Sequence, residues 1–472
     1  MSADALRKQL AEALRVNEQQ ARVNEQQARR IAELEAMVEQ LREELGRNSS
    51  NSSKPPSSDS ASQREKNRQK RKRRQSKRRR GGQPGHKGSC RKLVGAEDVD
   101  QVNDHYPDIC NSCWQALAKQ AFCVPTRCQV TELSSKGGVQ VVEHRRHCVR
   151  CACGYVTKAD RSQLPRSAFG PRLTATVALL TGVFHLSRRQ AQQLLWDLFS
   201  IKVALGTISN IEARMSQRLE AGYGQAKDAA DRASIKHTDG TSWRRAGKPL
   251  QLWTVATTAV TVFYVLADGT AQKLRTLFGR IKGILISDRA KAINFWAMKR
   301  RQICWAHLFR KFISFSERDG PAGTIGKELV DYCEVLFETY RAYAISDISR
   351  RIFRQRMAPV RRQVEALLQK AIASKIKRLS GSCQDILEHK HALWTFVDRL
   401  HVEPTNNHAE RELRAFVLWR KKSFGSQSER GDRFAERIMT TIHSLRKQHR
   451  TVLPYLTALL TAGAEQPSLL AA

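Results

Sequence analysis

Acidic side chains are scarce in this chain relative to basic ones. Its 472 residues include 45 Asp and Glu against 82 Lys and Arg, which gives a formal net charge of +37 at pH 7. Such an excess repels itself unless the protein has a polyanionic partner. Nucleic acid is therefore the first candidate partner, and an anionic membrane surface is the second.

Long apolar runs are also missing. No stretch is apolar over the roughly 20 residues that a membrane-spanning helix needs, and residues 1–7 lack the apolar core of a signal peptide. We therefore predict a cytoplasmic protein with no membrane partner. Its eleven cysteines would then lie in a reducing compartment, where clustered cysteines bind metal more often than they form disulfides.

Proline is absent from residues 1–46, which favours one long helix. Apolar positions there follow the 3–4 spacing of a coiled-coil seam, and they are Ile31, Leu34, Val38, Leu41 and Leu45. We predict a coiled-coil helix over residues 1–46 that joins copies of the chain into a homo-oligomer. A solvated single helix is the alternative.

Residues 47–104 read as a low-complexity linker and a basic arm. Between positions 64 and 80, 12 of 17 residues are Lys or Arg, and Glu65 is the single acid. Because so dense a charge cannot pack into a core, we expect the arm to be disordered when free and to bind DNA phosphates without regard to sequence. A merely solubilising tail is the alternative. The arm residues predicted to contact DNA are Arg71, Lys72, Arg73, Arg74, Arg78, Arg79 and Arg80.

Residues 105–160 hold a cluster of cysteines. Two Cys-x-x-Cys pairs, Cys110 with Cys113 and Cys148 with Cys151, offer the four thiolates that a structural Zn²⁺ site needs. We predict a zinc-binding module with these four ligands, and reduced core cysteines are the alternative. The rival ligands are Cys123, Cys128, Cys153, His144 and His147.

Residues 165–225 read as helices, with Ser187 as an N-cap. Two short helices, over 187–199 and from Thr207 to Met215, are joined by a turn. This pattern predicts a helix-turn-helix DNA-binding region. An ordinary helical hairpin is the alternative.

From residue 230 the pattern changes to strands rich in Val, Thr and aromatic residues, and then to helices over 291–401 and 407–460. Asp239 follows one predicted strand, Asp288 ends another, and Glu410 stands at the start of a helix. If the two strands pair, the three carboxylates can share one crevice and hold two Mg²⁺ or Mn²⁺ ions, which can drive phosphodiester chemistry.

Each of these acids also has a plain structural interpretation. Asp239 with Gly240 is an ordinary turn dipeptide. Asp288 can cap a helix that begins near Ala290, and Asn407 with Glu410 has the spacing of a capping box.

Two arginines, Arg411 and Arg414, follow Glu410 and share one helix face. We predict that they hold the scissile strand by its phosphates. A solvated basic face is the alternative.

Five sequence words occur in order along the chain: Asn-Ser-Ser-Lys-Pro-Pro-Ser-Ser-Asp at 51–59, Gly-Gly-Gln-Pro-Gly-His-Lys-Gly at 81–88, the paired Cys-x-x-Cys motifs, Cys304-Trp-Ala-His307-Leu-x-Arg310, and Asn406-Asn-x-Ala-Glu-Arg411. Together they resemble transposases of the insertion sequence 66 family, over residues 48–445. The resemblance implies a DDE enzyme with an RNase H-like domain and a mostly helical insertion.

The resemblance further implies that Asp239, Asp288 and Glu410 form the metal-binding triad of a DNA transposase. The enzyme would cleave single strands at the element ends and join the freed 3′-hydroxyls to target DNA. Its partner would be double-stranded DNA, and companion proteins of the element are allowed for. Its place would be the nucleoid of a bacterial cell. Cys304 and His307 would order the site without binding zinc; an equal alternative is that both are core residues.

The predicted fold class is thus multidomain, with an α/β RNase H-like catalytic core. A coiled-coil helix over 1–46, a basic arm over 47–104, a zinc-binding module over 105–160 and a helix-turn-helix region over 165–225 precede it. The catalytic domain spans 230–445 with its insertion at about 300–400, and a C-terminal helix and tail follow over 446–472. The rival function is a non-enzymatic, zinc-containing DNA-binding regulator, which leaves the strand-rich block around the acids unexplained.

Overall fold

The computed structural model describes residues 20, 24–39, 41–42, 92–134, 137–165, 167–279, 282–461 and 465–470. The chain divides into two compact units, residues 1–88 and 89–472. In the first unit, residues 24–39 are helical, as predicted. The seam residues Ile31, Leu34 and Val38 are 56%, 46% and 47% exposed, so the seam has no partner within the chain's described residues. Leu45 and residues 47–91, which include Arg71 to Arg80 of the basic arm, lie outside them. The predicted arm was drawn too long, because strand β1 (Gln101–His105) begins before its predicted end at residue 104.

The second unit begins with small sheets. Strands β1 (Gln101–His105), β3 (Val139–Arg146) and β2 (Thr126–Leu133) form a three-stranded sheet in that order. β1 runs parallel to β3 and β2 runs antiparallel to it. A separate hairpin joins β4 (Cys148–Arg150) to β5 (Val156–Lys158). Short 3₁₀ turns flank these strands, η2 (Ala96–Asp98) and η3 (Arg161–Gln163).

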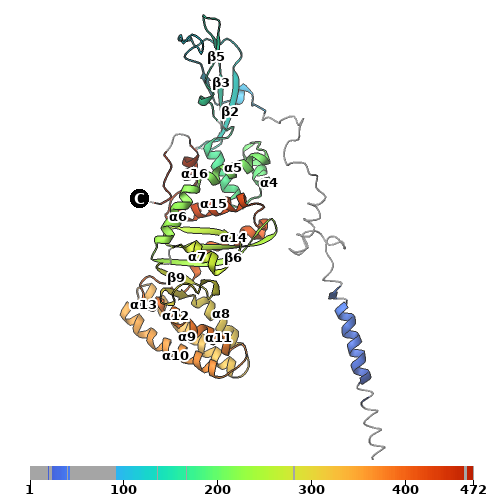
Figure 1. The fold of residues 1–472 in the computed structure, drawn as a ribbon, viewed down its shortest axis with the longest axis vertical. Helices are drawn as coiled ribbons and strands as arrows, with labels where there is room; N and C mark the ends of the chain where they lie inside the picture. Colours follow the sequence, from blue (N-terminus) through green and yellow to red (C-terminus); the bar gives the residue numbers. More distant parts are fainter. Residues whose placement is uncertain are drawn as a thin grey trace, which may run out of the picture. The chain divides into compact units, whose positions relative to one another are not determined.

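Four helices follow, in Figure 1 between these strands and the larger sheet: α3 (Pro171–Thr181), α4 (Arg188–Phe199), α5 (Leu205–Arg218) and α6 (Glu220–Arg232). Ser187 caps α4 as predicted. Its hydroxyl accepts from the backbone N–H of Gln190, and the Gln190 side-chain oxygen accepts from the backbone N–H of Ser187, so the two form a capping box. Leu195 of α4 and Ile208 of α5 are fully buried in one cluster with residues of α3. The predicted pair of helices joined by a turn is therefore present.

The larger sheet has five strands in the order β10-β9-β6-β7-β8. β6 (Ile235–Arg245), β7 (Lys248–Ala256) and β8 (Thr261–Leu266) are an antiparallel meander. β9 (Ile284–Ser287) and β10 (Arg301–Ile303) add to the β6 edge, each parallel to its neighbour. Helix α7 (Ala271–Phe278) makes the crossover from β8 to β9, and η4 (Lys291–Ile293) and η5 (Met298–Arg300) lead into β10.

One glycine in β6 permits close packing next to Asp239. Gly240 lies opposite Trp253 of β7, and a Cβ at position 240 would come within 2.8 Å of the Trp253 ring. Any other residue there would push the indole aside. The contact between Gly240 and the Trp253 ring therefore fixes how closely β6 and β7 pack beside Asp239.

Helices α14 (Asn407–Ser423) and α15 (Glu429–Lys447) pack on the meander, and α16 (Val452–Leu460) packs against α3. Phe416 of α14, Ile438 of α15 and Phe263 of β8 are fully buried in the core that results. Polar contacts fix the same layer, since the Trp243 indole donates to buried Asp432 at 3.0 Å. That bond joins α15 to β6, and α14, the helix that carries Glu410, packs on the same strand through Phe416, whose ring lies 5.4 Å from that of Trp243.

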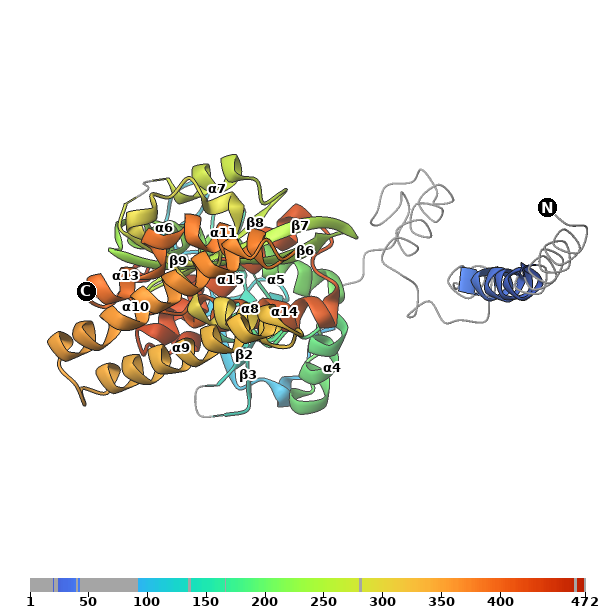
Figure 2. The ribbon, with the colours of Figure 1, turned by 90° about the horizontal axis from the view of Figure 1, so that it is seen from below.

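The predicted helical insertion is present between β10 and α14. It consists of α8 (Trp305–Ser316), α9 (Pro321–Ala344), α10 (Arg350–Ala373), α11 (Ser380–Glu388), α12 (Lys390–Leu393) and α13 (Thr395–Asp398). Figure 2 shows α9 and α10 running side by side. The bundle has its own core, which includes Ile286 of β9 and Ile303 of β10, so it is anchored on the β9–β10 edge of the sheet. Within the described residues, no helix is both long and apolar enough to cross a membrane.

Candidate active site and cysteine cluster

Asp239 lies within β6, which runs on to Arg245. The alternative that Asp239 and Gly240 form a turn is therefore wrong, because both residues pair with β7. The carboxylate accepts from the backbone N–H of Gly240 at 2.9 Å. Its neighbours Thr238 and His237 are buried, whereas Asp239 itself is partly exposed at the sheet.

Asp288 follows directly on β9. The parallel register pairs His237 of β6 with Ile286 of β9, and two residues further along each strand come Asp239 and Asp288. Parallel strands in this register place the two acids side by side on neighbouring strands. The Asp288 carboxylate also accepts from the Ala290 backbone N–H at 2.9 Å, so part of the predicted capping role holds, in a turn that leads to a 3₁₀ helix.

A buried arginine, Arg301, holds the backbone at Asp288 by hydrogen bonds. The Arg301 guanidinium donates to the Asp288 carbonyl at 2.7 Å, to the Asn294 side chain at 2.8 Å and to the Ser287 hydroxyl at 3.1 Å. Burial lowers the pKa of Arg301 to about 10, and the nearby Asp288 charge opposes that shift. Sequence inspection missed Arg301, because a lone arginine in a strand gives no sign of burial.

Glu410 lies in the first turn of α14. The predicted capping box with Asn407 is not formed, since the helix N-cap is Asn406 and no side chain caps it. The Asn406 amide instead donates to the Thr238 carbonyl at 2.8 Å. The start of α14 is thus tied to the residue that precedes Asp239.

Cys304 joins the third segment to the other two. Its backbone N–H donates to the Ser287 carbonyl at 2.8 Å, next to Asp288. Its Sγ accepts from the Asn406 backbone N–H at 3.2 Å. Burial raises the pKa of the Cys304 thiol. Cys304 and Asn406 therefore connect all three segments that carry the acids.

The three carboxylates influence one another electrostatically. The pKa of Asp239 is raised from 3.8 to about 7, first by burial and then by the charges of Asp288 and Glu410. A carboxyl with this pKa is about half protonated near pH 7, and a bound cation would favour its ionised form. The buried Glu410 Oε1 atom has no hydrogen-bond partner in the described part of the chain. Carboxylate oxygens grouped in this way are the ligands that hard divalent cations such as Mg²⁺ or Mn²⁺ prefer.

A cleft of about 570 Å³ opens beside Asp288 and is mostly basic. Its lining residues are Asp288, Arg289, Ala290, His307, Arg310, Lys311 and Ser314. Arg289 is engaged by Asp385 in an ion pair, whereas Arg310 makes no hydrogen bond or ion pair among the described residues. Beyond the glutamate, Arg411 and Arg414 are exposed, and neither forms an ion pair within the described ranges.

The Trp305 side chain is fully buried. Its indole N–H donates to the Leu393 carbonyl at 2.7 Å, and its ring lies 4.8 Å from that of Trp394. Trp305 is therefore a core residue of the insertion.

Four cysteines in the first sheet region form a group that can hold a metal ion: Cys110, Cys113, Cys151 and Cys153, whose sulfur atoms all lie within 4.8 Å of one another. The Sγ–Sγ distances are 3.7 Å from Cys110 to Cys153 and 3.4 Å from Cys113 to Cys151. The Ser112 backbone N–H points at the Cys110 sulfur, at 3.4 Å, as in a metal-binding knuckle. Four sulfurs at this spacing fit a tetrahedral Zn²⁺ site.

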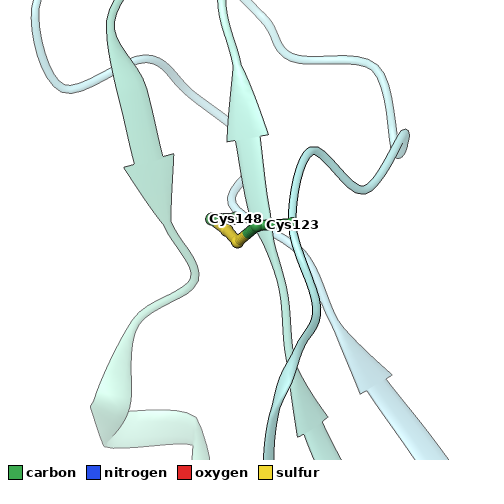
Figure 3. The surroundings of a disulfide bond; sticks show 2 residues. All are labelled: Cys123 and Cys148. Atoms are coloured by element: carbon green, nitrogen blue, oxygen red, sulfur yellow. A yellow bond between two sulfur atoms is a disulfide. The ribbon is translucent and has the colours of Figure 1, made fainter.

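The predicted ligand Cys148 does not belong to this group. Figure 3 shows it in a disulfide with Cys123, across a Cα–Cα distance of 6.1 Å. Cys148 begins strand β4, and its carbonyl accepts from the Phe122 N–H at 2.8 Å, which brings Cys123 alongside. Cys151 instead begins a tight turn with Gly154 in the left-handed region at φ 88°, and that turn presents Cys153. The second knuckle is therefore Cys-x-Cys, and the expectation of metal binding in place of disulfides fails for Cys148.

The described structure defines a mixed α/β protein in which Asp239 lies within β6, Asp288 follows β9, and Glu410 lies in the first turn of α14, the helix that packs on β6. Comparison with known families then specifies it. The family profile described as "Transposase IS66 family" matches residues 166–433, which is more than half of the chain. The protein belongs to the IS66 family of transposases. A second profile, a family of unknown function (DUF6444), matches residues 7–92. No curated protein matches the chain.

Proposed function

We propose that the protein cleaves the ends of an insertion sequence and joins the 3′-hydroxyl ends to target DNA. Asp239, Asp288 and Glu410 are the catalytic carboxylates of this proposal and hold two Mg²⁺ or Mn²⁺ ions. The observation that carries it is that Asp239 and Asp288 lie on neighbouring parallel strands, and that the charges of Asp288 and Glu410 both contribute to the raised pKa of Asp239. Membership of a transposase family supports DNA as the substrate.

The sheet topology supports an RNase H-like assignment of the catalytic domain. An antiparallel meander followed by two parallel strands on the edge of its first strand is the arrangement expected of that fold. The insertion between β10 and α14 falls between the second and third acid, as the resemblance implies. We propose the domain limits given above on the same basis, with 165–225 as a helix-turn-helix region.

Within this proposal, residues around the acids hold them in position and neutralise the phosphate charges of DNA. Arg301 holds the Asp288 backbone, and Asn406 holds that of Thr238, so the acids keep their spacing before DNA arrives. Arg310, Arg411 and Arg414 bind backbone phosphates on either side of the site. When bound, two divalent cations activate a water or 3′-hydroxyl and stabilise the departing oxygen. Catalysis then rests on charge and positioning, with no covalent protein–DNA intermediate.

The cysteine group supports a structural Zn²⁺ as a second cofactor. The proposed ligands are Cys110, Cys113, Cys151 and Cys153. The ion would hold the turn at Cys113 against that at Cys151 and would have no part in the chemistry.

The proposal is tested by strand cleavage of DNA carrying the element ends, in Mg²⁺, with Asp239→Ala, Asp288→Ala and Glu410→Ala. We expect each variant to lose at least about 10³-fold in cleavage rate, because each removes a ligand of ions that stabilise the transition state. Asp331→Ala, which removes an exposed carboxylate of α9, is the matched control and should cleave normally. Wild-type cleavage by any of the three variants would remove that residue from the site.

The rival function, a DNA-binding regulator without enzymatic activity, gives a different result in the same assay. It expects normal DNA binding by all the variants and no nicking by the wild type. The raised pKa of Asp239 among two further acids favours the enzyme, since a regulator has no use for a cluster of uncompensated carboxylates.

A further inference from the structure

Glu410 has two unusual neighbours for an acid in a magnesium site. The side chains of Cys304, His307 and Glu410 each offer a ligand atom, and these atoms all lie within 4.8 Å of one another. Cys304 is the N-cap of α8, and His307 follows in its first turn. The insertion therefore presents a thiol and an imidazole directly to the proposed catalytic glutamate.

The polar atoms in this cluster are left without protein partners. The His307 Nδ1 and Glu410 Oε1 atoms are 3.6 Å apart, which is beyond hydrogen-bonding distance. Both atoms are shielded from solvent and have no hydrogen-bond partner in the described part of the chain. Leaving two such atoms unpaired costs free energy, and a bound cation would satisfy both.

The cluster is also rigid on one side and accessible on the other. Cys304 is fully buried and is fixed through the Ser287 carbonyl and the Asn406 N–H. The side chains of His307 and Glu410 are 37% and 32% exposed, and His307 lines the basic cleft. An ion can therefore enter from the cleft and meet a ligand that is already in place.

We propose that Cys304, His307 and Glu410 form a binding site for a borderline-soft divalent cation of the Zn²⁺ class. Thiolate and imidazole select Zn²⁺ over Mg²⁺, and three protein ligands with one open position match a zinc site that is accessible to solvent. Ligand atoms around tetrahedral zinc lie about 3.5 Å apart, so the three groups close by roughly 1 Å. On binding, the Cys304 thiol releases its proton to solvent. The resemblance implies that Cys304 and His307 order the site without binding zinc, and the geometry points instead to metal binding.

The consequence rests on the proposed function. Zn²⁺ at this site and the catalytic ions compete for the same carboxylate of Glu410. Zinc therefore inhibits strand cleavage at a fixed Mg²⁺ concentration, and added Mg²⁺ relieves the inhibition. Free zinc would set how much of the enzyme is active.

Binding is tested on the full chain, reduced and loaded with one Zn²⁺ at the four-cysteine group, by titration with Co²⁺. We expect one further Co²⁺ to bind with a thiolate-to-cobalt absorption band. Cys304→Ser should abolish that band, and His307→Ala should weaken binding at least about tenfold. Cys383→Ser changes another buried cysteine, in the core of the insertion, and should keep the band. Circular dichroism of each variant shows that it is folded.

A folded, zinc-loaded Cys304→Ser protein that binds the further Co²⁺ with the same band and affinity would overturn the site. The same conclusion follows if the zinc-loaded wild type binds no further Co²⁺ with a thiolate-to-cobalt band. Neither result depends on DNA cleavage, so failure of this site is distinguishable from failure of the proposed function.

Inhibition is tested by measuring the rate of strand cleavage at a fixed Mg²⁺ concentration and increasing Zn²⁺ concentrations. The rate of each protein is divided by its own rate without zinc. The wild type should lose at least about tenfold in cleavage rate at zinc concentrations that saturate the proposed site, and His307→Ala should need at least about tenfold more zinc for the same inhibition. Equal inhibition of both proteins would refute competition at Glu410.

Discussion

Asn406 is the residue on which the position of Glu410 most depends. Its amide reaches the Thr238 carbonyl and its backbone N–H reaches the Cys304 sulfur, and the residue is fully buried. Asn406→Ala removes one of these bonds and leaves a buried carbonyl unpaired. We expect it to lower the free energy of unfolding by about 1–3 kcal/mol and to slow cleavage at saturating DNA.

Asn407 provides the matched control, because it is the adjacent asparagine and is exposed. Thermal unfolding and single-turnover cleavage of Asn407→Ala should resemble the wild type. If the two alanine variants behave alike, Asn406 does not position the acid.

Asp239 makes the stability of the metal-free protein depend on pH. Its folded pKa of about 7 lies above its ordinary value of 3.8. Its contribution to stability is therefore present below about pH 4 and is lost as the pH rises through about 7. Asp239→Asn should stabilise the metal-free protein at pH 8 by at least about 1 kcal/mol, which raises Tm by a few degrees, and should have little effect at pH 4.

Thermal unfolding in a chelator at the two pH values measures this difference. Added Mg²⁺ should raise the Tm of the wild type at pH 8 more than that of Asp239→Asn. If Asp239→Asn is no more stable than the wild type at pH 8, the ionised Asp239 carboxylate does not destabilise the metal-free protein, and the prediction is wrong.

At the scale of elements, the two cysteine turns make the sharpest prediction. The structure assigns Cys153 to the metal-binding group and Cys148 to a disulfide. Cys153→Ser should lower the zinc content of the purified, reduced protein by about one ion per chain relative to the wild type, whereas Cys148→Ser should keep the wild-type content. Elemental analysis measures the zinc content of the two variants. If Cys148→Ser loses zinc and Cys153→Ser keeps it, the ligands are the two Cys-x-x-Cys pairs that the sequence predicted.

The elements differ in how far the sequence could predict them. The strand patterns around Asp239 and Asp288 correctly predicted strands there, and Asp288 follows its strand as expected. The prediction that Asp239 follows a strand was wrong, because β6 continues through it to Arg245, and the parallel pairing of β6 with β9 came from the structure alone. The capping of α4 by Ser187 was also predicted correctly, because it depends only on residues within one helical turn. Cys148 was assigned wrongly because spacing alone does not show that Gly154 turns the chain so that Cys153 faces Cys110.

Long-range contacts explain what the sequence could not show. Arg301 and Asn406 position the acids through bonds to backbone carbonyls 13 and 168 residues away, and such partners leave no mark on a local pattern. The capping-box interpretation of Glu410 failed for the same reason, since tertiary contacts of Asn406 replaced the local bond. The proximity of Cys304 and His307 to Glu410 also depends on the fold of the whole insertion.

At the scale of the whole molecule, charge should dominate DNA affinity. Deleting residues 64–80 removes 12 basic residues and one acid from a chain of net charge +37. Each lost phosphate contact lowers the slope of log affinity against log salt by about 0.9. We expect the slope to fall by at least about 4 in a binding titration on duplex DNA, and an unchanged slope would mark the arm as a solubilising tail.

The account as a whole depends on the three acids sharing metal ions. A crystal structure of the protein soaked in Mn²⁺, with anomalous scattering to locate the ions, tests this most directly. We expect two peaks about 4 Å apart, bounded by Asp239, Asp288 and Glu410. Peaks bound elsewhere, or carboxylates too far apart to share an ion, would contradict the proposed enzyme.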